Sequence, residues 1–138
     1  MRVEVYWNLH KLCWSVRALE GESKGRVIQH TGELNLKDCT MAVQPAGNAK
    51  VRKEGKKNVH AFIRGELVDT GTPPVEKSLP IIYNPYKYTS FMKQHSLQVV
   101  VPTYRADYVA FRPDGSVRSW VKPEKRGVAW GTAKGRKA

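Results

Sequence analysis

Apolar and polar residues alternate along the first part of the chain. Residues 3–9 place Val, Val, Trp and Leu at every second position, and residues 12–17 repeat the pattern with Leu, Trp and Val. This period of two is typical of strands with one buried face. Because residues 8–11 can turn, we predict a β-hairpin with His10 and Lys11 at its tip.

Further strand-like runs, divided by turn residues, follow the first hairpin. They predict strands over residues 26–31, 33–43, 58–64, 81–83, 86–91, 99–101, 108–112 and 116–121. A Pro-Asp-Gly turn joins the last two runs into the clearest hairpin of the chain. Residues 46–54 predict a short helix closed by Gly55, although Gly47 weakens this prediction and a basic loop also fits.

Together these elements predict an α+β, mainly antiparallel β protein. We expect a single compact sheet or a partly open barrel of short strands, with one or two short helices. The length of 138 residues suits one domain. Residues 1–121 are the predicted globular domain. Residues 122–138 carry six basic side chains against one acid and predict a basic tail that stays disordered until it meets a partner.

The charge balance points to a polyanionic partner. The chain has 24 Lys and Arg against 12 Asp and Glu, a formal net charge of +12, and a sequence pI near 9.9. A small domain with such an excess of positive charge is typical of proteins that bind nucleic acid. A basic protein with no polyanionic partner is the plainer alternative.

Cysteine usage and apolar content indicate a soluble protein of a reducing cytoplasm. Cys13 and Cys39 are the only cysteines, too few for a disulfide framework or a Cys-based zinc site. The first residues contain no apolar core of a secretory signal. Valines 99–101 are among the longer apolar runs, far shorter than the roughly 20 residues that span a membrane.

One stretch concentrates the chemically active residue types. Residues 50–57 hold five basic side chains against one acid, and residues 58–64 then alternate like a strand. In a strand, His60, Phe62 and Arg64 share one face, because side chains alternate with a period of two. A basic run leading to an imidazole, an aromatic ring and a guanidinium predicts a surface that faces phosphate.

Three segments resemble small uncharacterised basic proteins of tailed bacteriophages. They are YWNLHK at residues 6–11, KNVHAFIRGEL at residues 57–67 and YNPYKYTSF at residues 83–91, about 26 of the 138 positions. No activity is attached to that group. The resemblance therefore implies a setting, an infected bacterium and its cytoplasm, and favours a protein that acts on nucleic acid or on host machinery.

The narrowest functional prediction is a metal-independent endoribonuclease. His60 and His10 are the candidate acid and base, since an imidazole titrates near neutral pH, and Arg64 is the candidate for stabilising charge on the phosphate oxygens. The histidines lack metal-ligand spacing and the acids are scattered, so no metal and no cofactor is predicted. A histidine on a strand face is, however, more often hydrogen-bonded and structural than catalytic.

A broader set of residues is predicted to contact nucleic acid. Lysine and arginine bind phosphate, tyrosine stacks on unpaired bases, and serine can orient the ribose. This set is Arg17, Lys50, Arg52, Lys53, Lys56, Lys57, Tyr86, Lys87, Tyr88, Ser90, Lys125 and Arg126.

Three function classes stay open at this point. The first is a nucleic-acid-engaging protein, with RNA ahead of DNA because aromatic and basic residues interleave, and with the ribonuclease as its narrow form. The second is a non-enzymatic nucleic-acid binder or an inhibitor of a host protein. The third is a virion or assembly protein whose basic tail contacts DNA or a neighbouring subunit.

Overall fold

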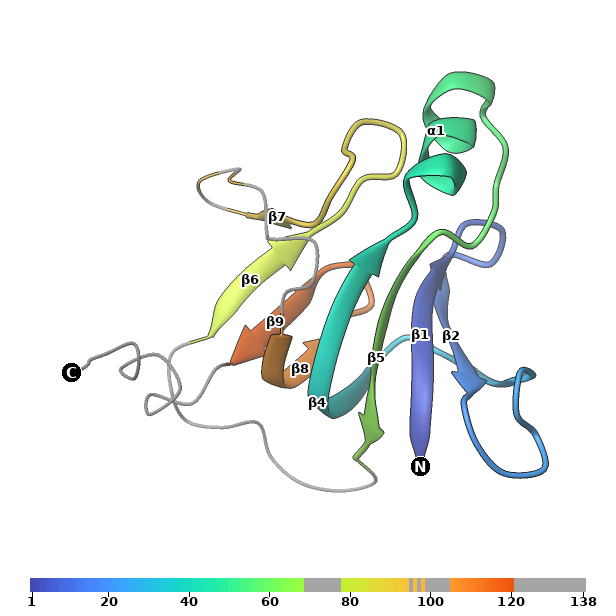
Figure 1. Cartoon of the computed structure of the whole chain (residues 1–138). Coiled ribbons are helices and arrows are strands. Elements are labelled where there is room, and N and C mark those ends of the chain that lie inside the picture. Colours follow the sequence, from blue (N-terminus) through green and yellow to red (C-terminus); the bar gives the residue numbers. More distant parts are fainter. Residues whose placement is uncertain (69–77, 95, 97, 99–104, 121–138) are drawn as a thin grey trace.

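The computed structural model describes residues 1–68, 78–94, 96, 98 and 105–120, and nine antiparallel strands form one sheet within them. In chain order the elements are β1 (Arg2–Asn8), β2 (Cys13–Ala18), β3 (Val27–Thr31), β4 (Leu34–Val43), α1 (Pro45–Glu54), β5 (Ala61–Leu67), β6 (Leu79–Ile82), β7 (Met92–Lys93), β8 (Arg105–Phe111) and β9 (Val117–Trp120). The strands lie side by side in the order β3-β2-β1-β5-β4-β8-β9-β6-β7 (Figure 1). The predicted class, mainly antiparallel β with a short helix, is confirmed.

The first hairpin forms as the alternation predicts. Strands β1 and β2 pair in register from Asn8 opposite Cys13, and Trp14 points into the core with 5 % of its surface exposed. Leu12 departs from the expected inward position, because it sits in the turn with a positive φ of 54° and is 67 % exposed.

A bulge bends the long strand β4 in its middle. Asp38 adopts a φ of 53°, and the pairing of β4 with β5 shifts register between Lys37 and Thr40. Gly65 of β5 lies against this bend, where a Cβ atom would come within 2.8 Å of the Lys37 carbonyl oxygen. Glycine is therefore required for the two backbones to pass so closely, and the bulge lets the sheet curve.

The curved sheet closes over one hydrophobic core. Trp14 of β2 and Phe111 of β8 lie with ring centroids 4.8 Å apart, although three strands separate β2 from β8 in the sheet. The Trp14 indole N–H also donates to the Arg112 carbonyl oxygen at 2.7 Å. The buried core consists of Val3, Val5, Trp14, Val16, Leu36, Cys39, Met41, Ile63, Ile81, Ala106, Val109, Phe111 and Val117. The result is an open sheet that curls strongly, as the predicted partly open barrel would.

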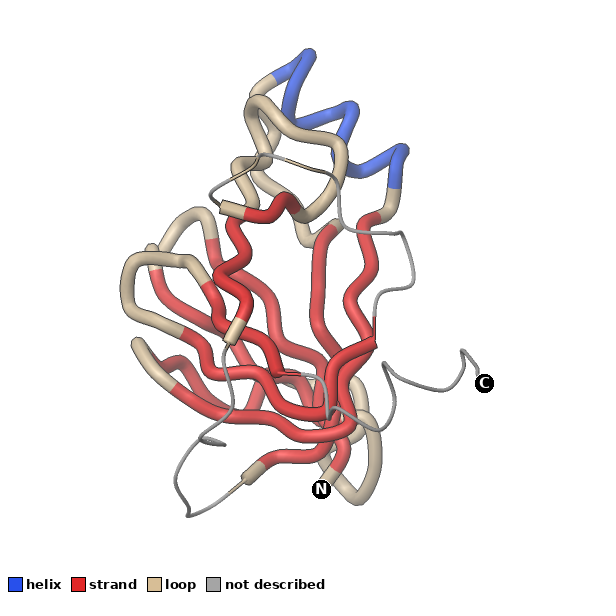
Figure 2. The backbone as a smooth tube through the Cα atoms, turned by 90° about the vertical axis from the view of Figure 1, so that its left-hand side faces the viewer, coloured by secondary structure: helices blue, strands red, loops and turns tan. Residues whose placement is uncertain are grey.

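Helix α1 covers one end of this sheet (Figure 2). It begins with Pro45 at its first position, where the missing N–H costs nothing, and ends at Gly55 in the left-handed conformation with a φ of 70°. Arg52 and Lys53 in the last turn complement the negative end of the helix dipole. The predicted helix with its glycine cap is thus correct.

The predictions about the second half of the chain have different outcomes. Residues 86–91 do not form the predicted extended strand, since Tyr86 and Lys87 lie in a turn and Ser90, half-buried, in a bend that follows it. The predicted strand at 99–101 and the tail at 122–138, with Lys125 and Arg126, lie outside the described residues. The hairpin of β8 and β9 around residues 113–115 is confirmed.

No helix within the described ranges is long and apolar enough to cross a membrane.

Candidate nucleic-acid interface

Basic residues predicted from the sequence lie on α1 and directly after it, and α1 lies at one end of the sheet (Figure 1). Lys50 and Lys53 lie three residues apart on the helix and are exposed, as are Lys56 and Lys57 beyond it. The helix and the six residues that follow it carry five cations against one acid, Glu54. We name this surface the basic end and define it by His10, Lys50, Arg52, Lys53, Lys56, Lys57, Tyr86 and Lys87.

The turn after β6 adds an aromatic ring and another cation to the basic end. The backbone N–H groups of Lys87 and Tyr88 donate to the Asn84 carbonyl oxygen at 3.1 and 2.8 Å. The Asn84 side-chain oxygen accepts from the N–H of Tyr86 at 2.9 Å. Tyr86 is 48 % exposed beside the exposed Lys87. The turn contacts α1, because Asn48 donates to the Tyr88 carbonyl oxygen at 2.8 Å.

A chain of hydrogen bonds fastens α1 to the sheet beneath these cations. Arg52 Nε donates to Asn48 Oδ1 at 2.6 Å, and Asn48 Nδ2 donates to the Tyr83 hydroxyl at 2.6 Å. The Tyr83 oxygen lies 2.7 Å from His60 Nε2. Asn48 is 1 % exposed, so its amide group forms its hydrogen bonds with other groups of the protein.

The chain continues through His60 back to the helix. His60 Nδ1 lies 3.0 Å from Asn58 Oδ1 and 3.3 Å from the Asn58 carbonyl oxygen, both of which only accept hydrogen bonds. We therefore assign the imidazole proton to Nδ1, which leaves Nε2 to accept from the Tyr83 hydroxyl. Asn58 Nδ2 then donates to the Gly47 carbonyl oxygen at 3.2 Å. A Cβ at Gly47 would lie 2.6 Å from His60 Cβ, so glycine lets the helix approach.

Burial shifts both titratable members of this chain toward their neutral forms. It lowers the pKa of His60 below 6.5, against a smaller opposite effect of the Asn58 carbonyl. Burial also raises the pKa of the Tyr83 hydroxyl to about 12, although Asn48 and Arg52 oppose the rise. A neutral His60 and a protonated Tyr83 are the forms that the directions of these hydrogen bonds need. All the hydrogen bonds of this network can therefore form without a proton being transferred from one residue to another.

The prediction that His60 faces outward beside Arg64 is wrong. His60 is 3 % exposed, because the helix that follows β4 packs over it at Gly47. Phe62, expected on the same outer face, is also buried. Catalysis by His60 stays a prediction, but its ring nitrogens contact protein groups on both sides.

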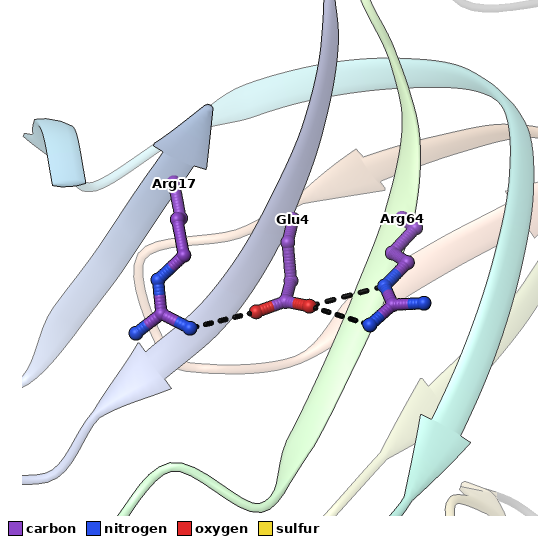
Figure 3. A network of polar contacts seen from close by, with 3 residues as sticks. All are labelled: Glu4, Arg17 and Arg64. Atoms are coloured by element: carbon purple, nitrogen blue, oxygen red, sulfur yellow. Dashed lines mark hydrogen bonds and ion pairs between the residues drawn. The ribbon is translucent and has the colours of Figure 1, made fainter. Parts of the chain in front are cut away.

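Arg64 and Arg17 belong to a second polar cluster, on the sheet (Figure 3). Glu4 of β1 lies between them, with Oε1 3.1 Å from Arg17 Nη1 and Oε2 3.0 Å from both Nε and Nη2 of Arg64. The guanidinium of Arg17 lies over the Tyr6 ring at 5.5 Å, and that of Arg64 over the Phe62 ring at 4.8 Å. Both predicted phosphate ligands are therefore already paired with a carboxylate.

His10 lies at the exposed tip of the first hairpin, as predicted. It lines a shallow hollow together with Lys57 and Asn58. Asn58 is the residue that also holds His60, but no hydrogen bond or ring contact joins the two histidines among the contacts of the described residues. Within those residues, no three His, Cys, Asp or Glu side chains form a group suited to a metal ion.

Three residues with structural importance were not singled out from the sequence. Asn48 looks like an exposed helix position, and nothing in its neighbours signals burial. The contact of Glu4 could have been predicted, because the register of the predicted hairpin sets it opposite Arg17. Ser15 was also missed: its hydroxyl lies 2.8 Å from His30 Nδ1, a Ser–His pair, but Ser15 is fully buried and so cannot meet a substrate.

Comparison with known proteins shows that the chain is a bacteriophage protein. Residues 1–118 match the family described as Mycobacterium phage L5 gene 82 protein. The gene 82 protein of Mycobacterium phage L5 is 41 % identical over 125 residues, which is 86 % of this chain and 95 % of that protein. The chain belongs to the phage L5 gene 82 protein family, and the predicted resemblance to phage proteins is confirmed. No solved structure matches the chain.

Proposed function

We propose that the protein binds single-stranded nucleic acid through its basic end, with RNA preferred over DNA. The observation that carries this proposal is the gathering of cations from two separate segments, residues 50–57 and the turn after β6, with Glu54 as the one acid among them. Cations spaced along one surface neutralise successive phosphates and release counterions, which supplies most of the affinity for a nucleic acid.

The anchoring of α1 supports this proposal. A flexible basic run loses conformational freedom on binding, whereas the hydrogen-bond chain through Asn48 and His60 holds the helix in place before any partner arrives. Tyr86, half-exposed beside Lys87, offers a ring on which an unpaired base can stack. An aromatic ring beside cations favours a single strand over a duplex, whose bases are already stacked.

The salt dependence of binding tests the proposal. We expect a labelled single-stranded RNA to bind the full chain in fluorescence anisotropy, with an affinity that falls steeply with salt. Replacing Lys50 and Lys53 by Gln should lower the slope of the logarithm of the binding constant against the logarithm of the salt concentration by about 1.4. Each phosphate contact on a single strand contributes about 0.7 to this salt slope. The charge-matched control is Lys24→Gln with Arg26→Gln, in the loop between β2 and β3, at the opposite end of the sheet (Figure 1).

Equal slopes for the two double variants would place the binding surface elsewhere. No binding to RNA or DNA at low salt would overturn the proposal and leave the host-protein inhibitor and the virion protein as the alternatives.

The ribonuclease is the narrow form of this proposal and needs its own test. A general base must reach the ribose 2′-hydroxyl, and His60 is enclosed, so exposed His10 is the better candidate. The test is incubation of the purified protein with bacterial RNA in EDTA. Cleavage that is lost in His10→Ala and kept in His60→Gln would support an enzyme, while intact RNA would leave a binder.

A further inference from the structure

A hollow opens at the basic end between the tip of the first hairpin and the segment after α1. Its volume is about 140 Å³. It is lined by Tyr6, Trp7, Asn8, Leu9, His10, Lys57, Asn58 and Val59. Two chain segments about fifty positions apart thus make one concave surface.

Both walls of the hollow are held by hydrogen bonds. On the hairpin side, Asn8 Oδ1 accepts from the backbone N–H groups of His10 and Lys11, each at 2.9 Å. Asn8 Nδ2 donates to the buried Ser15 hydroxyl at 3.1 Å. On the other side, Asn58 is fixed by Gly47 and His60, as described above. The shape is therefore formed before a ligand binds.

The functional groups in the hollow fit one kind of ligand. Lys57 and His10 are exposed, and neither side chain has a hydrogen-bond partner among the contacts of the described residues. No carboxylate lines the hollow, so nothing there repels an anion. Trp7, Leu9 and Val59 supply an apolar wall. A cation and an imidazole beside an apolar, partly aromatic wall match the phosphate and the base of a nucleotide.

We propose that this hollow holds one unpaired nucleotide of the bound strand, with its phosphate at Lys57 and His10 and its base against the wall of Trp7, Leu9 and Val59. The inference rests on the proposed function and goes further by assigning a subsite. The subsite gives two adjacent lysines different roles, because Lys57 lines the hollow, while Lys56 does not and instead pairs with Glu54 at 3.3 Å.

That pair of lysines gives the decisive comparison. Lys57→Gln and Lys56→Gln remove the same charge from neighbouring positions. In anisotropy with single-stranded RNA, we expect Lys57→Gln to weaken binding about fivefold more than Lys56→Gln, because it alone removes a contact in the subsite. Equal losses would overturn the subsite and leave binding at the basic end intact. A wild-type protein that binds no strand at all would defeat both proposals.

A second measurement follows the ligand directly. The full chain is titrated with uridine monophosphate and, separately, with uridine and with inorganic phosphate, while NMR monitors the histidine rings. We expect the His10 signals to move with the nucleotide more than with either part alone, and the His30 signals on β3 to stay fixed. Deoxyuridine monophosphate tests the sugar preference. Shifts of His10 no larger than those of His30 would refute the subsite.

Discussion

The two polar clusters of this protein bury their polar groups in opposite ways. Around His60 the hydrogen bonds join uncharged groups, with Arg52 as the one ion, and Asn48 and His60 are 1 % and 3 % exposed. Around Glu4 the contacts are ionic, between a carboxylate 6 % exposed and the guanidinium-bearing side chains of Arg17 and Arg64, which are 32 % and 50 % exposed. In the first cluster the two central residues are buried, whereas in the second both guanidinium groups reach solvent.

This difference shows which cations are available to a partner. Arg17 and Arg64 are compensated by Glu4 and packed over aromatic rings, so a phosphate would have to compete with a carboxylate for them. In the His60 cluster the polar groups form hydrogen bonds with one another, and the lysines of α1 stay exposed. The sheet cluster therefore stabilises the fold, whereas the His60 cluster positions a charged surface.

The largest expected effect is on the His60 side of the comparison. Asn48→Ala should lower the free energy of unfolding by about 2–3 kcal/mol, because it leaves the half-buried Tyr83 hydroxyl and the Tyr88 carbonyl without a donor. The better helix propensity of alanine offsets only about 0.5 kcal/mol of this. Urea unfolding followed by circular dichroism measures the loss.

The matched control for that variant is Lys50→Ala, two positions further on the exposed side of the helix, which should stay within about 0.5 kcal/mol of wild type. If Asn48→Ala were as stable as this control, the hydrogen-bond chain would not be what holds α1.

A smaller loss is expected on the Glu4 side. Glu4→Gln keeps the size of the side chain but removes the charge between two guanidinium groups, and should cost about 1 kcal/mol because both arginines reach solvent. The difference in the free energy of unfolding between Glu4→Gln and wild type should shrink in 1 M salt, since screening weakens ionic contacts. Thermal or urea unfolding at two salt concentrations checks both statements.

Glu54→Gln serves as the comparison for Glu4, because its ion pair with Lys56 is exposed on both sides and should contribute almost nothing. A loss for Glu4→Gln that is independent of salt would mean that packing, and not charge, makes this carboxylate important.

Local sequence signals predicted most of the fold. Alternation predicted the first hairpin, the Pro-Asp-Gly turn predicted the hairpin of β8 and β9, and Gly55 marked the end of α1 because a left-handed cap is a local requirement. What could not be predicted depends on how α1 packs. Gly47 seemed to weaken the helix prediction, yet it is the residue that lets the helix lie against His60. The burial of His60 follows from that contact and leaves no trace in the residues around it.

The candidate surface was predicted in part for the same reason. The cations between 50 and 57 are adjacent in sequence and stayed together in the structure. Tyr86 and Lys87 lie near them only because the turn after β6 bonds to Asn48. Arg17 and Arg64 moved out of the candidate surface, because strand register pairs each of them with Glu4.

The smallest expected effect is a pH dependence confined to the His60 cluster. Burial lowers the pKa of His60 in the folded protein below its unfolded value near 6.5. Below pH 6.5 the unfolded chain therefore binds the proton more readily, so this contribution to stability is complete above pH 6.5 and is lost as the pH falls. Between pH 7.0 and pH 6.0 the loss is at most about 0.7 kcal/mol for one histidine.

Urea unfolding of wild type and His60→Gln at both pH values tests this pH dependence. The difference in the free energy of unfolding between the two proteins should narrow on acidification, while His10→Gln, at an exposed position, should follow wild type. A constant difference between wild type and His60→Gln would mean that His60 is not held neutral by its neighbours, and the contrast between the two clusters would then fail at its central residue.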